Sequence, residues 1–239
     1  MLESKEFTTY SNSQVIDEGL RNYMLKIYNY MAGGLSVTAL SAYLVVTNRV
    51  LWSMFYTQTG LSGLGWLALF APLILILAFG HVLNRGTIGQ VQAMFWGFSA
   101  LMGISLAPIF LIYTGASITR VFLITAAAFG SLSLYGYTTK KDLSVWRSFL
   151  VMGVIGLIIA SVVNIFLRST GLDYALSYLT VFIFSGLVAY DTQTLRSTYY
   201  ANGYNEELVA RGAIAGALSL YLDFINLFRA LLSIMGDRR

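Results

Sequence analysis

Long apolar runs recur through almost the whole chain, and they constrain the fold more than any other feature of the sequence. A membrane-spanning helix needs about 20 predominantly apolar residues. The sequence supplies seven such runs in succession, and they cover Tyr28 to Val46, Trp66 to Leu83, Ala93 to Tyr113, Ile118 to Tyr137, Phe149 to Leu167, Tyr174 to Arg196 and Leu208 to Met235. Only 11% of the residues are charged, whereas soluble domains carry about 25%. The sequence therefore predicts an all-α integral membrane protein with seven transmembrane helices.

The ends and connections of the spans predict how the chain lies in the membrane. Residues 1–25 are polar and include several acidic side chains, unlike a basic signal peptide, so we expect a short exposed segment followed by a membrane domain over residues 26–239. With seven spans, nine Lys and Arg residues lie on the same side of the membrane as the N-terminus, and three lie in loops on the opposite side. Three more arginines near the C-terminus add to that opposite side. The excess of positive charge predicts a cytoplasmic N-terminus.

Several function classes lack their sequence signals. The chain has no cysteine, which excludes disulfides, cysteine-ligated metals and thiol catalysis. It also has no GxxxxGK phosphate loop, no HExxH zinc motif and no lysine within a span that could form a retinal Schiff base. We therefore expect no bound cofactor and no nucleic-acid partner, and we expect that the protein is not an enzyme.

Small and aromatic residues in the spans predict packing and anchoring. Pairs at four-residue spacing, such as Ala93 with Gly97 and Ala126 with Gly130, allow helix backbones to approach closely. Aromatic side chains near span ends, among them Tyr28, Trp66 and Tyr178, are expected to anchor the helices at the membrane interface. Pro108 is expected to bend the third span.

Two aspartates within the last two spans are the strongest functional signal. Asp191 and Asp223 lie in otherwise apolar sequence, and a carboxylate at bilayer depth costs roughly 2.5 kcal/mol or more, so it is normally retained only at a cavity, a partner or a proton path. The two spans are consecutive and joined by a short loop, so they should be antiparallel. If the carboxyl groups meet, repulsion and desolvation would make them share a proton near neutral pH, and the pair would titrate as a unit.

Neighbouring side chains indicate what the pair could bind. Ser219 and Asn226 fall on the Asp223 face of a helix, and their oxygens are ligands that calcium accepts, although a dedicated calcium cage needs more of them. Arg229 lies on a different face and is expected to extend to the interface. The structural alternative is that each aspartate only bonds a neighbouring helix.

Three segments resemble the Bax inhibitor-1 family, particularly its bacterial members. They are KKDLSVWRSFL at 140–150, GLVAYDTQ at 186–193 and LSLYLDFINLF at 218–228, and the resemblance extends over all seven spans. It implies a bundle whose last helix is central, in a bacterial inner membrane. It also implies a pH-sensitive calcium leak controlled by a pair of aspartates that correspond to Asp191 and Asp223.

The family resemblance further implies an arginine near the end of the second helix that latches the pair in the closed state. The segment LAFGHVLNRG offers only His81 and Arg85 there, so both are weak candidates. A lone histidine at a helix end is more often simply interfacial.

Two other functions are compatible with the sequence. Paired aspartates on consecutive spans also occur in intramembrane aspartyl proteolysis, where one carboxyl acts as acid and the other as base, but Leu222 stands where a glycine is expected before the second aspartate. The second possibility, which the resemblance also allows, is a membrane-embedded interaction protein that modulates membrane proteases or stress and cell-death pathways without conducting ions.

Overall fold

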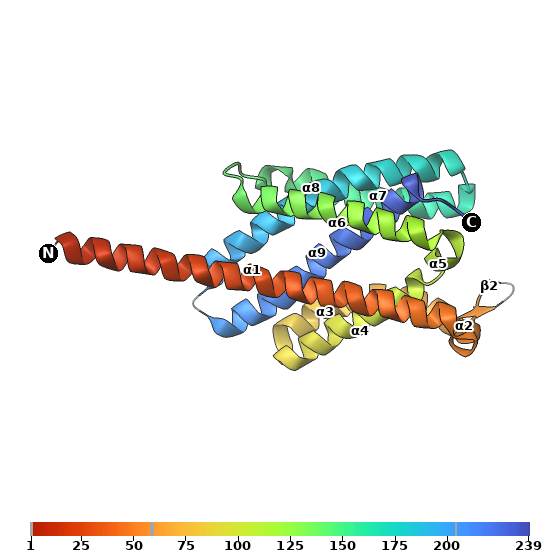
Figure 1. The fold of residues 1–239 in the computed structure, drawn as a ribbon, viewed down its shortest axis with the longest axis horizontal. Helices are drawn as coiled ribbons and strands as arrows, with labels where there is room; N and C mark the ends of the chain where they lie inside the picture. The colour runs from red at the N-terminus through yellow and green to blue at the C-terminus, as the bar shows by residue number, and fades with distance from the viewer. Residues whose placement is uncertain (1, 58–59, 204) are drawn as a thin grey trace.

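The computed structural model describes residues 2–57, 60–203 and 205–239 and shows a bundle of long helices (Figure 1). The helices are α1 Leu2–Thr47, α2 Arg49–Phe55, α3 Gly63–Arg85, α4 Ile88–Leu106, α5 Ile109–Ile112, α6 Gly115–Thr138, α7 Arg147–Leu167, α8 Thr170–Asn202 and α9 Glu206–Met235. A 3₁₀ turn, Ser144–Trp146, precedes α7, and two short strands, β1 Tyr56–Thr57 and β2 Gly60–Leu61, pair antiparallel between α2 and α3.

Seven segments of the described chain are long and apolar enough to cross a membrane, which confirms the predicted number of spans. They are Glu18–Thr47, Gly63–Arg85, Ile88–Ile112, Gly115–Thr138, Ser144–Leu167, Thr170–Ala201 and Glu206–Met235. Their outward-facing side chains are largely apolar, as lipid contact requires; Ile74, Ile165 and Phe182 are each more than half exposed. The protein is an all-α integral membrane protein.

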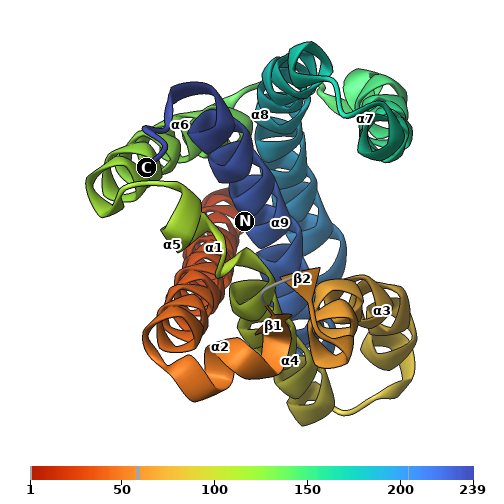
Figure 2. The same ribbon diagram turned by 90° about the vertical axis from the view of Figure 1, so that its right-hand side faces the viewer.

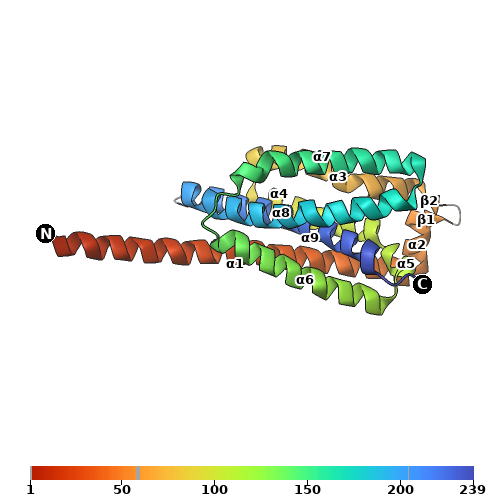
Figure 3. The ribbon, with the colours of Figure 1, turned by 90° about the horizontal axis from the view of Figure 1, so that it is seen from above.

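The first helix begins far before the predicted first span. Helix α1 is continuous from Leu2, and its first turns project beyond the other helices (Figures 1 and 3). Leu20, Tyr23 and Met24 are already buried, and with Ile27 they follow the three- and four-residue spacing that places side chains on one helix face. The packed part of the chain therefore begins before residue 26, because this face extends the apolar stripe of α1 toward the N-terminus.

Helix α9 occupies the centre of the bundle. It packs directly against α1, α4, α6 and α8, whereas α3 packs on α4 and α7 packs on α8 at the periphery (Figure 2). In its most apolar stretch 56% of the residues are buried, while no other described span exceeds 28%. Tyr221 is fully buried on α9, and its ring lies edge-on to Phe95 and Phe98 of α4. The last helix is thus central, as the resemblance implied.

Two prolines shape the second and third spans. Pro108 follows the end of α4, and the chain resumes as α5 at Ile109, so the predicted bend is a helix break. Pro72 lies inside α3, where its missing N–H leaves the carbonyl four residues earlier without a helical donor. The Ser105 hydroxyl of α4 donates to that carbonyl, on Ala68, at 2.9 Å. This bond stabilises the α3–α4 contact.

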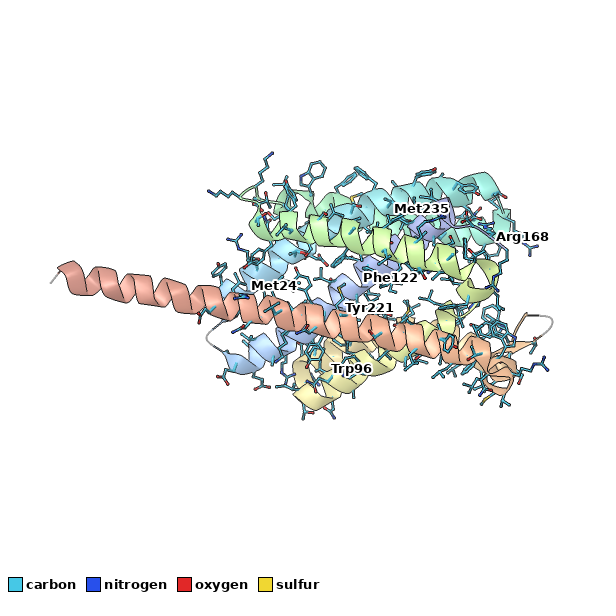
Figure 4. The ribbon with its side chains drawn as sticks, in the orientation of Figure 1. Met24, Trp96, Phe122, Arg168, Tyr221 and Met235 are labelled. Atoms are coloured by element: carbon cyan, nitrogen blue, oxygen red, sulfur yellow. The ribbon has the colours of Figure 1, made fainter. Side chains whose placement is uncertain are left out.

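Different turns and connecting segments lie at the two ends of the bundle. The N-terminal end holds the turns that follow α3, α6 and α8, and the C-terminal end holds the turn between α7 and α8, the β1–β2 hairpin and the last residues of the chain (Figures 1 and 3). Figure 4 shows Tyr221 near the middle of the bundle, and Arg168 and Met235 at the C-terminal end.

Candidate functional site

Asp223 lies midway along the central helix and is buried, with only 4% of its surface exposed. Its Oδ2 atom makes no hydrogen bond to any described residue. The large majority of buried side-chain polar atoms in native proteins are hydrogen-bonded, so an exception calls for an explanation such as a bound ion, a water molecule or a catalytic role. The central position of α9, which packs against α1, α4, α6 and α8, accounts for the burial of this carboxyl.

Asp191 is half-buried on α8 and is joined to α9 by a hydrogen bond. The Ser219 hydroxyl, one turn before Asp223 on α9, donates to Oδ2 of Asp191. The Asp191 carboxyl is also close enough to Asp223 to interact with it electrostatically. The structure therefore brings both sequence-predicted aspartates together, with Ser219 between the two helices.

No cation neutralises the pair in the described part of the chain. The salt bridges found there join Arg120 to Asp237 and Arg211 to Glu207. Arg196, one turn from Asp191 along α8, instead donates to the Tyr137 carbonyl at 2.9 Å. Its guanidinium also lies over the Tyr137 ring, 5.9 Å from the centroid. Arg196 thus binds the end of α6 and does not bind the carboxyls.

The latch candidates from the sequence lie away from the pair. His81 and Arg85 are exposed on α3, and they line a cavity of about 590 Å³ between α3 and α4. Neither forms a hydrogen bond or an ion pair with Asp191 or Asp223 among the described residues. The geometric reason is that α3 packs on α4, and α4 in turn packs on α9.

Arg211 is a structural cation, although it is also one of the nine Lys and Arg residues that indicate membrane orientation. It lies near the start of α9 and donates to the carbonyls of Leu83 and Gly86, each at 2.6 Å. These carbonyls belong to the C-terminal end of α3, where the last carbonyls lack helical partners. Arg211 therefore ties the central helix to the α3–α4 turn, and its pairing with Glu207 holds it there.

A hydroxyl network beside Asp191 was not predicted. The Tyr28 hydroxyl lies 2.6 Å from Ser133 Oγ, which lies 3.0 Å from Thr192 Oγ1. Tyr28 was expected to anchor α1 at the interface, but its hydroxyl points into the bundle because α1, α6 and α8 meet there. The signal that could have revealed the network is the set of serine and threonine residues on facing spans.

Asn226 shares the Asp223 side of α9 but does not bind the carboxyl. Its Nδ2 donates to the Leu222 carbonyl at 2.8 Å, and its side chain lines a polar cavity that opens toward the C-terminal end of the bundle. Asn226 thus lies between this cavity and Asp223, one turn from the carboxyl.

The donor set around the pair suits a passing cation or a proton. It consists of two carboxyls and the Ser219 hydroxyl, whereas calcium takes about six to eight oxygen ligands. The described residues contain no group of three or more His, Cys, Asp or Glu side chains that could hold a metal ion. Any cation at this site would keep part of its hydration shell.

The fold and the site define a seven-helix integral membrane protein with a pair of carboxyl groups against its central helix. Residues 20–239 match the family described as inhibitor of apoptosis-promoting Bax1. The chain therefore belongs to the Bax inhibitor-1 family.

Bacterial relatives match nearly the whole chain. An uncharacterised protein of Rickettsia prowazekii is 44% identical over 99% of this chain and 98% of its own length. An uncharacterised protein of Caulobacter vibrioides is 45% identical over 94% of this chain and 92% of its own. The inner membrane protein YbhL of Escherichia coli is 40% identical over 92% of this chain and 94% of its own.

Proposed function

We propose that the protein is a pH-sensitive calcium leak of a bacterial inner membrane, gated by Asp191 and Asp223, with its N-terminus in the cytoplasm. It acts without catalysis. The observation that carries the proposal is the buried Asp223 carboxyl, whose Oδ2 atom has no hydrogen-bond partner among the described residues and which lies close to a second carboxyl. The similarity to the inner membrane protein YbhL of E. coli supports the location in the inner membrane.

Shared protonation supplies the gate in this proposal. When the pair holds a proton, it carries less negative charge and offers a cation less attraction. When both carboxyls are ionised, their repulsion is relieved by a divalent cation between α8 and α9. No described cation lies within ion-pair distance of either aspartate, so ionisation favours cation entry over a latch. Calcium flux should therefore rise as the pH increases.

Calcium flux into proteoliposomes between pH 5 and 8 tests the proposal. Wild-type protein should conduct with a pH dependence that Asp191→Asn and Asp223→Asn both alter. Asp237→Asn is the matched control, because Asp237 is an exposed aspartate that pairs with Arg120, and its flux should equal that of wild type. Unchanged flux and pH dependence in Asp223→Asn would reject the aspartate gate.

Absence of wild-type flux above that of empty vesicles would reject conduction. The family's other implied role, an interaction protein that modulates membrane proteases or stress pathways, would then become the better account. Copurification of a membrane partner with the Asp191→Asn, Asp223→Asn double variant would show that partner binding does not need the pair.

A further inference from the structure

A polar cavity of about 580 Å³ opens at the C-terminal end of the bundle, among α7, α8 and α9. Most of its lining side chains are polar although they lie within spans, and those that matter here are Ser161, Ser177, Thr180, Asn226, Arg229 and Ser233. Polar side chains at membrane depth are normally tolerated where they face a bundle interior or a water-filled cavity. This cavity is therefore a place where water and solutes can enter the helix bundle.

The charged groups of the cavity leave an excess of positive charge. Arg229 of α9 and Arg168, between α7 and α8, contribute two cations, and Asp173 of α8 contributes one carboxylate, so the formal sum is plus one. Asp173 is already engaged, because Nδ2 of the buried Asn164 donates to its Oδ1 at 2.5 Å. The carboxylate is thus bound to the α7–α8 turn.

Arg229 has no such partner. No hydrogen bond or ion pair joins its guanidinium to another described residue. It lies six residues before the end of α9 and six after Asp223, about 9 Å along the helix from each. The Arg229 side chain is exposed, in line with the expected extension toward the interface, and it lies in the wall of this cavity.

Position and charge together determine which solutes the cavity favours. A guanidinium without an ion-pair partner attracts anions and repels cations, and beside the protein wall of a cavity this effect is stronger than in bulk water. Hydroxyl and amide groups near it supply donors for an oxyanion, and arginine binds carboxylate and phosphate oxygens particularly well.

We propose that this cavity admits small oxyanions in preference to cations, and that Arg229 sets this preference. The occupant is a carboxylate or phosphate group, either free in solution or part of a lipid headgroup. The consequence for calcium rests on the proposed function. The positive charge of Arg229 opposes calcium entry toward the aspartate pair from the C-terminal end, and an anion bound to Arg229 makes this entry easier.

The absence of cysteine from the sequence gives a direct test, since a single introduced cysteine is the only thiol. Ser233 lines the cavity one turn after Arg229, about 6 Å along the helix. Ser233→Cys protein in nanodiscs would be treated with matched thiosulfonate reagents, one bearing a sulfonate and one bearing a trimethylammonium group. The quantity measured is the ratio of their reaction rates, divided by the same ratio for a free small thiol.

The normalised ratio should favour the anionic reagent in Ser233→Cys and fall by about tenfold when Arg229→Gln is added, as removal of one nearby charge predicts. Arg229→Lys should retain the preference. Arg120→Gln, at the same end of the bundle but paired with Asp237 outside the cavity, should leave the ratio unchanged. The proposal would be overturned if Arg229→Gln left the normalised rate ratio unchanged, or if the cysteine reacted with neither reagent.

Protection experiments distinguish a free oxyanion from a lipid headgroup as the occupant of the cavity. Inorganic phosphate should slow the anionic reagent if a free anion occupies the cavity, whereas nanodiscs of anionic phosphatidylglycerol should slow it relative to neutral phosphatidylcholine if a headgroup does. Neither of these two protection measurements depends on calcium flux. A vesicle assay without flux would therefore reject the leak and leave the charge preference intact, while Arg229→Gln should increase flux only if both proposals hold.

Discussion

The two halves of the α8–α9 helix pair differ in whether their charged side chains have hydrogen-bond partners. Toward the N-terminal end, Arg196 and Arg211 bind backbone carbonyls of α6 and α3, and Ser219 bonds Asp191 across the helix interface. Toward the C-terminal end, the helices border a polar cavity and Arg229 has no partner among the described residues. We call the N-terminal half closed, because hydrogen bonds join its helices, and the C-terminal half open, because it borders the cavity.

This difference shows that the aspartates are not neutralised by the cations nearest to them in sequence. Arginines in the closed half satisfy helix ends, where carbonyls lack donors. Among the described residues, the two carboxyl groups therefore have no ion-pair partner, and Arg229, which also has none, lies in the wall of the cavity. A buried pair of this kind costs stability, and proteins retain such costs mainly at functional sites.

The closed half should be the more sensitive to added volume. A Cβ atom on Gly136 of α6 would lie 2.2 Å from the Ala189 carbonyl oxygen of α8. Because the obstacle is backbone, Gly136→Ala should lower the free energy of unfolding by about 1–3 kcal/mol, measured as thermal stability in detergent. Gly130→Ala on the same helix is the matched control, since a Cβ there meets nothing within 4 Å. Equal stability of the two variants would contradict this close approach.

Arg211→Gln tests the tie between the central helix and the α3–α4 turn. The substitution removes two hydrogen bonds to carbonyls from a largely buried charged group. Bonds of this kind contribute about 1.5–3 kcal/mol each, and the net loss should be about 2 kcal/mol because water can replace part of them. Thermal unfolding in detergent measures the loss. Glu207→Gln should change stability by less than about 1 kcal/mol, since Glu207 is 62% exposed and surface pairs contribute little.

Much of this arrangement follows from the sequence. The seven apolar runs predict the spans, and their consecutive order predicts that the last two helices are antiparallel with Asp191 and Asp223 on adjacent elements. The spacing of Ser219 predicts that it shares a face with Asp223. Sequence cannot give the relative translation of α8 and α9, which decides that Ser219 bonds Asp191 and leaves Asp223 Oδ2 without a donor among the described residues.

Other features depend on which helices touch, and this information is absent from a single sequence. Gly97 and Gly130 fit the small-residue pattern, yet a Cβ on either meets nothing within 4 Å, whereas Gly103 and Gly136 lie directly against backbone. Every glycine in an apolar helix carries the same local signal. Likewise, Arg85 resembles a latch in sequence position, but its helix packs at the periphery.

Replacing the aspartates by leucine should separate their structural contributions. Asp223→Leu removes a buried oxygen that has no described donor and should stabilise the protein by about 1–2 kcal/mol, because unsatisfied polar groups are costly to bury. Asp191→Leu should gain less, since it also removes the acceptor of the Ser219 hydroxyl. Thermal unfolding in detergent at pH 7 compares them. Destabilisation by Asp223→Leu would show that the carboxyl holds the fold together.

The smallest expected effect is a pH response of the loop that closes the N-terminal end. Gln193 of α8 accepts from the Leu143 N–H and donates to the Lys141 carbonyl, each at 2.8 Å, so it holds the chain on both sides of Asp142. Hydrogen bonds from the Ser144 hydroxyl and from its backbone N–H lower the pKa of Asp142 below its usual value of 3.8.

A lowered pKa means that the folded loop favours the ionised carboxyl, so the stabilisation is complete above the ordinary value and is lost as the pH falls through the lower folded value. Amide exchange of Ser144, measured relative to the intrinsic rate of an unprotected amide at each pH, should therefore accelerate only in strong acid. Ser144→Ala removes the hydroxyl but keeps the N–H, and it should move this acceleration to a higher pH. Gln193→Ala should speed exchange at every pH instead, because it releases the loop from α8 without changing the Asp142 carboxyl. If both variants shifted the pH midpoint equally, the attachment to α8, rather than the Ser144 hydroxyl, would set the titration of this loop.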